Sequence, residues 1–438
     1  MAIFAAPKQK WMFSIRFSCL FALIAVLSLT SVKAQTFGTG DGDDGTLQLN
    51  TITTAVPFLM ISPDARAGGM GDVGVATSPD AASIHWNPGK LAFAENKMGF
   101  AVSYAPWLRA LVPDINLAYV SGYGKIGKKG LQTLAGSLRY FSLGDITFTD
   151  VNGNTIGNFN PNEFAIDLAY ARVLAKGFSG GLALRYVYSN LTGGINVGGA
   201  DTRPGMSFAA DLGFYYQNTK IKVLKKKTVL SAGLSFSNIG SKMSYTNTTQ
   251  EDFIPMNLRL GVGFSMLFDD YNSLGVYLDV NKLLVPTPPR YLKTIGSDGD
   301  PTQVDSLDIN GGRIISAGKD PNVSVPSGLF QSFGDAPGGT AEEFKEVQVS
   351  VGLEYWYSLK GKRLFSIRTG YFHEDPIKGN RQYVTLGASI RYNVFGLDFA
   401  YLVPITQRHP LENTLRFTLT FDFEAFKKQE KGAEDPAE

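Results

Sequence analysis

Hydrophobic and polar residues alternate strictly in the last long segment of the chain, which runs from Leu415 to Phe423. Leucine and phenylalanine occupy the odd positions, whereas Arg416, two threonines and Asp422 occupy the even ones. Because successive side chains of a β-strand point to opposite faces, this segment predicts a strand with one apolar and one polar face. Such a strand fits either a soluble sheet or a barrel wall between lipid and a wet lumen.

The same alternation recurs from Lys97 onward, in segments of about 10 to 15 residues that are long enough to cross a bilayer when tilted. We therefore expect an all-β membrane protein, in which about fourteen strands close into an antiparallel transmembrane β-barrel. The last strand should pair with the first. The expected strands cover residues 97–108, 114–126, 131–149, 163–174, 178–191, 205–221, 227–240, 256–267, 271–285, 344–359, 364–375, 382–394, 395–405 and 413–426.

Charged residues fall on the polar faces of these strands. A charge on the lipid face costs roughly 2 to 4 kcal/mol at the bilayer midplane, so we expect the charged face to line the lumen. The residues concerned are Arg139, Asp167, Arg185, Asp211, Arg259, Asp279, Glu354, Arg368, Arg391, Asp398 and Arg416. Because their signs are mixed, a charge network that holds the strands and a plug together is favoured over an ion-selective pathway.

The connections between the expected strands are alternately short and long. The short ones, expected on the periplasmic side, are 127–130, 175–177, 269–270, 360–362 and 394–395, together with a longer basic turn at 222–227. The long ones, expected outside the cell, are 150–162, 192–204, 241–255, 286–343, 374–381 and 404–412. Nothing in a soluble β-sandwich requires short and long connections to alternate. The alternation therefore favours a barrel in the outer membrane of a Gram-negative bacterium.

The two ends of the chain differ from this pattern. Residues 1–34 combine basic residues, an apolar run from Phe17 to Leu29 and a small-residue cleavage site ending at Ala34, which predicts a signal peptide. That run is shorter than the roughly 20 residues of a membrane-spanning helix. The single cysteine, Cys19, lies within it. Residues 427–438 are predicted to form a charged periplasmic tail, which would place both termini in the periplasm.

Residues 35–96 predict a flexible leader and then a compact plug, with short helices at about 79–85 and 88–94. The residues that we assign to the plug are Arg66, Gly69, Gly71, Gly74, Asn87 and Pro88. The three glycines form a literal G-x-G-x-x-G, the fingerprint of a dinucleotide-binding turn. No buried parallel strand precedes them and no strand-helix alternation follows, so we interpret them as sites of tight turns and close packing against the wall.

Composition narrows the function further. Of the 438 residues 44% are hydrophobic and 18% charged, and mean hydropathy is −0.03, which is too low for a bundle of membrane helices. A net charge of +2 with scattered lysines indicates no nucleic-acid partner. His85, His373 and His409 fall in the plug and in two different loops, without metal-ligand spacing. We predict no enzyme, and no catalytic, metal or cofactor site.

The connection 286–343 is longer than is needed to join two neighbouring strands. It is rich in Gly, Pro, Asp and Ser and contains an apolar cluster at Leu329, Phe330 and Phe333. Loops of this length are usually functional or disordered. Partner recognition and a disordered lid are therefore equal alternatives at this point.

One region carries a resemblance to a known family. Residues 58–77 read FLMISPDARAGGMGDVGVAT, and residues 83–93 read SIHWNPGKLAF. A shorter pattern, made of Ala-Arg-Ala at 65–67, Met-Gly at 70–71 and Asn-Pro at 87–88, is shared by the FadL family and its relatives. FadL proteins are fourteen-stranded transporters of hydrophobic compounds. The full segment resembles more narrowly the plug of the PorV family, also called LptO, the outer-membrane barrels of the type IX secretion system. Gly89 departs from the alanine that such plugs commonly carry.

The resemblance implies an outer-membrane shuttle. PorV-like proteins receive cargo from the translocon barrel SprA (Sov), bind its C-terminal signal domain and carry it to the PorU-containing attachment complex. On that basis the loops 241–255 and 286–343 become candidate docking sites for cargo or translocon. The candidate contact residues are Tyr245, Phe253, Leu329, Phe330 and Phe333. Outer-membrane lipid and lipopolysaccharide are further expected partners.

Three other functions could use the same barrel. A FadL-type transporter would need a gap beside the plug for a hydrophobic solute. A PorQ-like adaptor of the same secretion system would differ in the partner that it holds. An outer-membrane lipid-modifying enzyme would need an acid, a base or a nucleophile close together near the rim.

Overall fold

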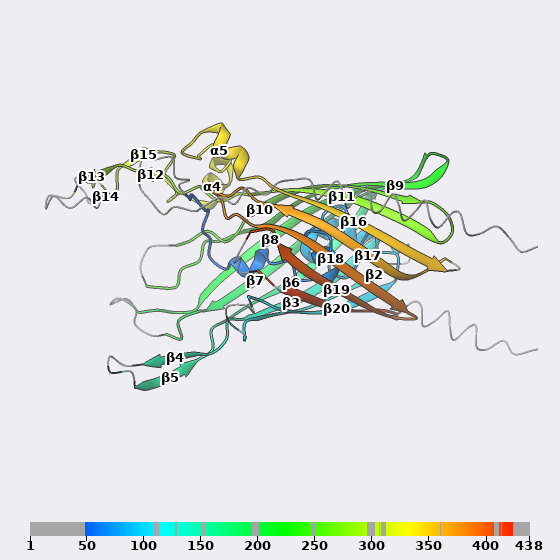
Figure 1. The fold of residues 1–438 in the computed structure, drawn as a ribbon, viewed down its shortest axis with the longest axis horizontal. Coiled ribbons are helices and arrows are strands. Elements are labelled where there is room, and N and C mark those ends of the chain that lie inside the picture. The colour runs from blue at the N-terminus through cyan, green and yellow to red at the C-terminus, as the bar shows by residue number, and fades with distance from the viewer. Residues whose placement is uncertain are drawn as a thin grey trace, which may run out of the picture. The chain divides into compact units, whose positions relative to one another are not determined.

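The computed structural model describes residues 49–423, apart from short gaps at 109–111, 113, 128, 150–151, 153, 195–200, 248–250, 296–302, 306, 308–311, 360, 407–410 and 413. The predicted signal peptide, nearly all of the leader and the tail lie outside the described residues. Fourteen antiparallel strands close into a barrel in sequence order (Figure 1), which confirms the predicted fold class. β1 and β20 close it, with Gly99 opposite Asp422 and Tyr104 opposite Phe417.

The barrel strands are β1 Met98–Pro106, β2 Asn116–Ile126, β3 Gln132–Ser142, β6 Asn162–Ala175, β7 Phe178–Asn190, β8 Gly205–Val223, β9 Lys226–Gly240, β10 Asn257–Leu267, β11 Asn272–Leu283, β16 Gln348–Leu359, β17 Lys362–His373, β18 Gln382–Tyr392, β19 Phe395–Pro404 and β20 Thr414–Asp422. Outside the wall, β4 Ile146–Thr149 pairs with β5 Thr155–Phe159, β12 Arg290–Tyr291 with β15 Ile315–Ala317, and β13 Lys293–Ile295 with β14 Gln303–Asp305.

Two predicted strands are wrong in extent. The expected strand 131–149 is interrupted after Ser142, because Gly144 adopts a φ of 84° and the chain then turns into the separate β4–β5 hairpin. The expected strand 344–359 begins only at Gln348, since Thr340–Lys345 forms helix α5. Its Ala-Glu-Glu-Phe-Lys sequence contains good helix formers, which the alternation pattern does not detect.

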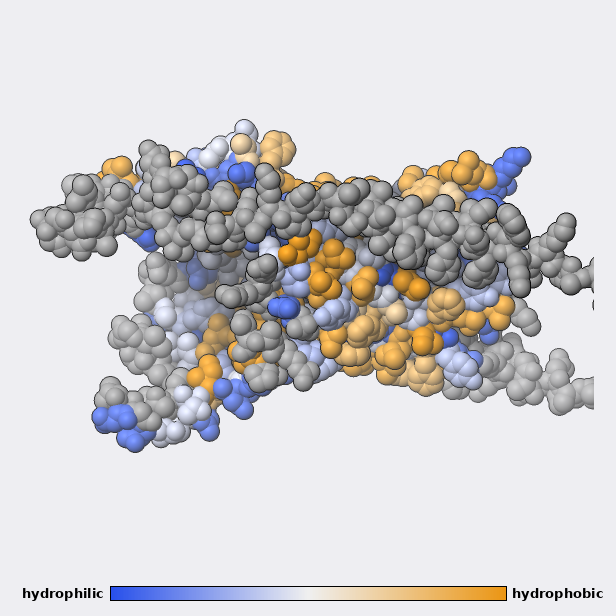
Figure 2. Space-filling model, in the orientation of Figure 1, coloured by the Kyte–Doolittle hydropathy of each residue, from blue (hydrophilic) through white to orange (hydrophobic). Residues whose placement is uncertain are grey.

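The outward face of the wall is apolar. Leu168, Leu184 and Phe208 are 70%, 61% and 71% exposed, whereas small or polar residues on the opposite face are buried. Figure 2 shows hydrophobic side chains gathered over the barrel wall. Apolar residues outside and polar residues inside are the reverse of the arrangement in a soluble protein, and this is the arrangement that a lipid-facing barrel requires. Within the described chain, no helix is long and apolar enough to cross a bilayer.

The barrel has two unlike ends. We call the end with the short connections, such as the one between β6 and β7, the turn end, and the opposite one the loop end. The described chain begins at the loop end, where the Asn50 amide donates to the Ile377 carbonyl oxygen at 2.9 Å and Asn50 Nδ2 to Glu342 Oε1 at 2.8 Å. β20 finishes at the turn end. The termini themselves, which are predicted to be periplasmic, lie outside the described residues.

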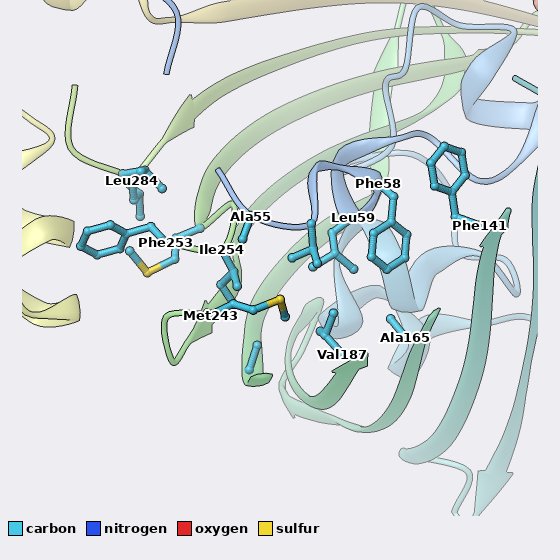
Figure 3. Packing of buried hydrophobic residues seen from close by; sticks show 14 of the residues in the cluster. Ala55, Phe58, Leu59, Phe141, Ala165, Val187, Met243, Phe253, Ile254 and Leu284 are labelled. Carbon is cyan, nitrogen blue, oxygen red and sulfur yellow. The ribbon is translucent and has the colours of Figure 1, made fainter. Parts of the chain in front are cut away.

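The plug is a series of short helices inside the barrel: η1 Pro57–Met60, α2 Ala65–Gly68, α3 Ser83–Trp86 and η2 Pro88–Phe93 (Figure 1). The predicted helix at 88–94 is present as η2, the one at 79–85 is reduced to α3, and the first two were not expected. At the loop end, Phe58 and Leu59 pack against Phe141 and Val187 of the wall (Figure 3). Residues of the loops complete this apolar cluster, among them Met243, Phe253, Ile254 and Leu284.

Candidate functional site

Arg66 of the plug makes a bidentate ion pair with the wall. Its Nε and Nη2 donate to the two carboxylate oxygens of Glu354 on β16, both at 2.9 Å. Burial alone would lower the pKa of Arg66, but the neighbouring carboxylates of Glu354 and Asp80 raise it well above its usual value. Arg66 therefore stays charged and joins the plug to β16.

The charges continue along the wall beyond Glu354. Arg368 donates to Glu354 at 2.9 Å and to Asp398 at 2.8 Å, and Arg391 pairs with Asp398 at 2.8 Å. Arg368, Glu354 and Asp398 are almost completely buried. Four of the predicted lumen residues thus form one ion-pair chain on β16 to β19, and the plug enters it through Arg66.

A second contact fixes the plug to the last strand. Arg416 on β20 donates to Asp72 at 2.8 Å, and the Tyr383 hydroxyl donates to the other Asp72 oxygen at 2.6 Å. The amide of Gly71 donates to Thr385 Oγ1 at 2.8 Å. The polar face of β20, which carries Arg416, therefore points into the lumen and binds the plug.

The opposite wall holds its charges differently. Arg185 pairs with Asp167 at 2.6 Å and with Asp211 at 2.9 Å, within the wall itself. Arg139 donates to the Leu59 carbonyl oxygen at 2.8 Å and to His85 Nδ1 at 2.7 Å. Burial lowers the pKa of His85 well below its usual value, and the nearby arginines lower it further, so this ring is neutral and accepts the hydrogen bond.

Asp279 and Arg259 complete the predicted lumen set. Asp279 accepts hydrogen bonds from the amides of Gly74 and Val75 at 2.7 and 2.9 Å. Arg259 lies over the ring of Trp86 at 5.0 Å, and its Nε and Nη1 have no hydrogen-bond partner in the part of the chain that the structure describes. Both residues contact the plug, but through its backbone and an aromatic ring instead of an ion pair.

The predicted plug residues lie where the plug backbone meets the wall. A Cβ atom on Gly69 would lie 2.9 Å from the Gly387 Cα, and one on Gly71, whose φ is 70°, would lie 2.7 Å from the Tyr371 nitrogen. Asn87 donates to the Phe214 carbonyl oxygen at 2.9 Å, and Pro88 packs beside Gly181 of β7. The plug therefore contacts β7 and β8 on one side of the lumen and β17 and β18 on the other.

Lys90 is a buried cation within the plug. Its Nζ donates to the Gly74 carbonyl oxygen at 2.6 Å and to Thr77 Oγ1 at 2.8 Å, and its side chain is fully buried. Burial lowers the pKa of Lys90 to about 8, although the charge of Asp80 opposes this shift. The protonation state of Lys90 in the folded protein therefore changes in the mildly alkaline range.

We expect the free energy of unfolding to rise with pH above pH 8 because of Lys90. Between pH 8 and about pH 9.5 the unfolded chain still binds the proton that the folded chain has released, which amounts to a gain on the order of 2 kcal/mol. In Lys90→Met this gain should disappear. Urea unfolding in detergent micelles at both pH values measures it, and parallel pH profiles for the two proteins would contradict the assignment.

A different feature occupies the loop end. Helices α4 Val325–Gln331 and α5 lie above the barrel rim (Figure 1). Phe330, Phe333 and Phe344 are 76%, 51% and 79% exposed. Phe333 and Phe344 line a pocket of about 380 Å³, together with Lys282, Ala336, Glu343 and Val347. We call the three phenylalanines and this pocket the rim surface.

Ion pairs attach the rim surface to the barrel. Lys282 at the end of β11 pairs with Glu343 at 3.1 Å and with Glu346 at 2.6 Å. Lys378 pairs with Glu342 at 2.7 Å and with Glu346 at 3.0 Å. The described part of the connection 286–343 near the rim is therefore an ordered helical structure, which argues against a disordered lid for these residues.

The structure divides the five predicted docking residues. Phe330 and Phe333 point outward, as expected for contact residues. Phe253 is only 8% exposed, Leu329 packs against the same apolar cluster, and half-buried Tyr245 donates to Ser189 Oγ at 2.9 Å. These three side chains belong to or pack against the apolar cluster at the loop end, and the docking role of the five residues stays a prediction.

Sequence reasoning missed Phe344. The only available signal was a single phenylalanine among charged residues in 340–345, a pattern that local alternation does not distinguish from the strand that was expected there. In the described chain, no three His, Cys, Asp or Glu side chains come together as a metal site would require.

The closed wall, the lumen plug and the lipid-facing belt together define a plugged β-barrel membrane protein. A model of the family described as "Type IX secretion system protein PorV" matches residues 45–290, more than half of the chain. The chain belongs to the PorV family of outer-membrane proteins. It is thus a component of type IX secretion, the bacterial export system that gives the family its description.

Solved structures show a more distant similarity. The toluene transporter TodX of Pseudomonas putida has 10% identity and a TM-score of 0.44, with 85% of this chain and 98% of TodX covered. The toluene transporter TbuX of Ralstonia pickettii has 12% identity and a TM-score of 0.42, with 82% and 97% covered. A FadL homologue of Pseudomonas aeruginosa has 10% identity and a TM-score of 0.41, with 86% and 100% covered. No curated protein matches the sequence.

Proposed function

We propose that this protein is an outer-membrane shuttle of the type IX secretion system. It binds the C-terminal signal domain of cargo that leaves the SprA (Sov) translocon and delivers it to the PorU-containing attachment complex. The family supports the secretion role. In this proposal the loop end faces outward, so the described chain begins outside the cell and ends in the periplasm.

The observation that carries the docking role is the rim surface. Phe333 and Phe344 stand exposed around one pocket, and Phe330 is exposed on the neighbouring helix α4. Ion pairs of α5 fix this region to the barrel. Aromatic side chains around a pocket are typical anchors of a protein interface, and surrounding polar groups exclude water from such anchors. Lys282 and Glu343 supply that polar border.

The plug argues for an adaptor instead of a hydrophobic-solute transporter. Its backbone touches the wall on both sides of the lumen, and Arg66, Asp72 and Gly71 bind three different strands. A solute passing beside the plug would have to break these buried contacts. A shuttle that binds cargo at its rim needs no such opening.

We expect the double variant Phe330→Asp with Phe344→Asp to lose cargo binding. Each substitution removes an exposed aromatic anchor, and the loss of two such anchors weakens an interface by at least about tenfold. The measurement is the amount of cargo signal domain that co-purifies with the barrel from detergent-solubilised outer membranes. Both residues are exposed, so barrel yield and heat resistance should not change.

Leu307→Asp is the matched control, because Leu307 is 60% exposed in the same connection but does not belong to the rim surface. It should retain normal cargo recovery. Recovery of the translocon barrel, followed in the same samples, shows which partner uses the rim surface. Normal recovery of both partners by the double variant would refute the docking assignment.

A further inference from the structure

The hairpin of β8 and β9 extends beyond its neighbours at the turn end. β7 begins at Phe178, opposite Tyr216, whereas β8 continues to Val223. β10 pairs with β9 only as far as Thr228. Beyond Gln217 the hairpin tip, residues 218–227, is therefore paired with neither neighbouring wall strand, and Figure 1 shows it bending away from the barrel beside the β9 label. Six residues of β8 at about 3.3 Å each give a projection of roughly 20 Å along the strand.

The hairpin tip is strongly basic. It carries Lys220, Lys222, Lys225, Lys226 and Lys227, with no acidic residue between them. Lys222 lies directly opposite Lys227 in the strand register. Like charges at facing positions of two strands destabilise a hairpin, so the free tip carries repulsion that an anionic partner would relieve.

The turn itself is also unusual. Leu224 and Lys225 adopt φ values of 51° and 63°, the left-handed region that two-residue hairpin turns normally fill with Asn-Gly or Asp-Gly. Leu224 is 84% exposed at the very tip. The sequence therefore accepts backbone strain to present an apolar side chain between lysines, which is typical of contact sites.

The free edge of the hairpin favours a protein partner over lipid. Even with a strand tilt of about 45°, β8 extends roughly 14 Å along the barrel axis beyond the end of β7. Its edge there exposes main-chain groups that a peptide strand can pair with, whereas a lipid headgroup offers phosphates alone. Lysines near the shorter turns, such as Lys125 and Lys176, provide the comparison for attraction to lipid phosphates.

We propose that the hairpin tip binds an acidic, extended segment of a periplasmic protein. Carboxylates of that segment pair with Lys222, Lys226 and Lys227, and an apolar side chain covers Leu224. The outer edge of β8 from 218 to 223 has no strand beside it in the described chain, so it can also donate and accept main-chain hydrogen bonds. This interaction lies at the opposite end from the rim surface and does not depend on cargo docking.

A photo-crosslinking amino acid at position 224 of the full-length protein, in the outer membrane of living cells, tests the proposal. Leu131, which is 43% exposed in the β2–β3 turn at the same end, is the matched control position. We expect a crosslinked polypeptide at position 224 at least tenfold above the yield at 131. Mass spectrometry should locate the crosslink in a segment rich in Asp and Glu.

Charge-reversal variants of the hairpin tip provide a second test of the proposal. Lys222→Glu, Lys226→Glu and Lys227→Glu together should reduce the crosslink yield at least tenfold, and the three Lys→Gln substitutions should do so to a smaller degree. Reversal of Lys125, Lys129 and Lys176 in the other turns should leave the yield unchanged. A crosslink to lipid, an equal yield after reversal at the tip, or no yield above position 131 would each overturn the proposal.

In a purified system the probe is a fluorescein-labelled decaglutamate peptide, added to the full chain in nanodiscs of phosphatidylcholine. We expect binding that weakens at least tenfold in the tip-reversed protein and by less than about threefold in the turn-reversed control. Equal weakening in both proteins would show a diffuse basic rim instead of a docking site, and would also overturn the proposal.

Discussion

Glu354→Gln is expected to lower the free energy of unfolding by about 3 to 5 kcal/mol, because it leaves two buried guanidinium groups without their shared carboxylate. Arg66 and Arg368 both donate to Glu354, and all three side chains are almost completely buried. Neither arginine can lose its charge at neutral pH or reach water without moving the plug. Urea unfolding of the purified protein in detergent micelles measures the effect.

Arg391→Gln provides the control for Glu354→Gln. Arg391 belongs to the same ion-pair chain, but its side chain is 24% exposed, and Asp398 keeps Arg368 as a partner when Arg391 is lost. A partly exposed pair contributes about 1 kcal/mol or less. If Glu354→Gln cost no more than this control, the plug would not be held by Arg66.

Gly370→Ala is expected to displace the plug from the barrel while leaving the wall intact. A Cβ atom on Gly370 would overlap the Met70 carbonyl carbon and the Gly71 nitrogen of the plug. Both are backbone atoms that a rotamer change cannot move, so the plug or the wall must shift as a whole, at a cost of about 1 to 3 kcal/mol or more. The strand ladder needs none of these contacts, so the barrel should persist.

Limited proteolysis and channel conductance in planar bilayers report this displacement. We expect Gly370→Ala to become cleavable between residues 61 and 96 and to conduct ions more than the wild type. Gly136→Ala on β3 is the control, since a Cβ atom there lies 3.6 Å from the nearest atom, an ordinary contact. A protease-resistant, closed Gly370→Ala barrel would show that the plug is not packed against β17 as described.

The barrel wall could be predicted from the sequence because its signal is local. Fourteen strands emerged from alternation alone, and the inward charges followed from the cost of placing them in lipid. Two strands were predicted with the wrong extent because a second local preference overrides the alternation. At Gly144 a positive φ ends β3, and in 340–345 residues of high helix propensity form α5 in place of the expected strand. The plug segment was also recognisable, since its glycines and Asn-Pro step exclude a regular strand.

The partners of those residues could not be predicted. Arg66 and Glu354 are 288 positions apart, and Asp72 and Arg416 are 344 positions apart, so nothing local joins them. The same limit applies to the docking residues. Phe253 and Phe330 look alike in the sequence, but the first is covered by neighbouring loop segments and the second is not.

The sequence by itself determined the strand pattern, because the direction of each side chain along a strand depends only on its parity. It also identified the plug segment and marked the turn at 222–227 as basic. Only the tertiary structure decided which end of the barrel the plug enters, which aromatic residues reach solvent, and how far the β8–β9 hairpin projects. Those properties depend on contacts between distant segments, and a periodic pattern carries no information about which segments meet.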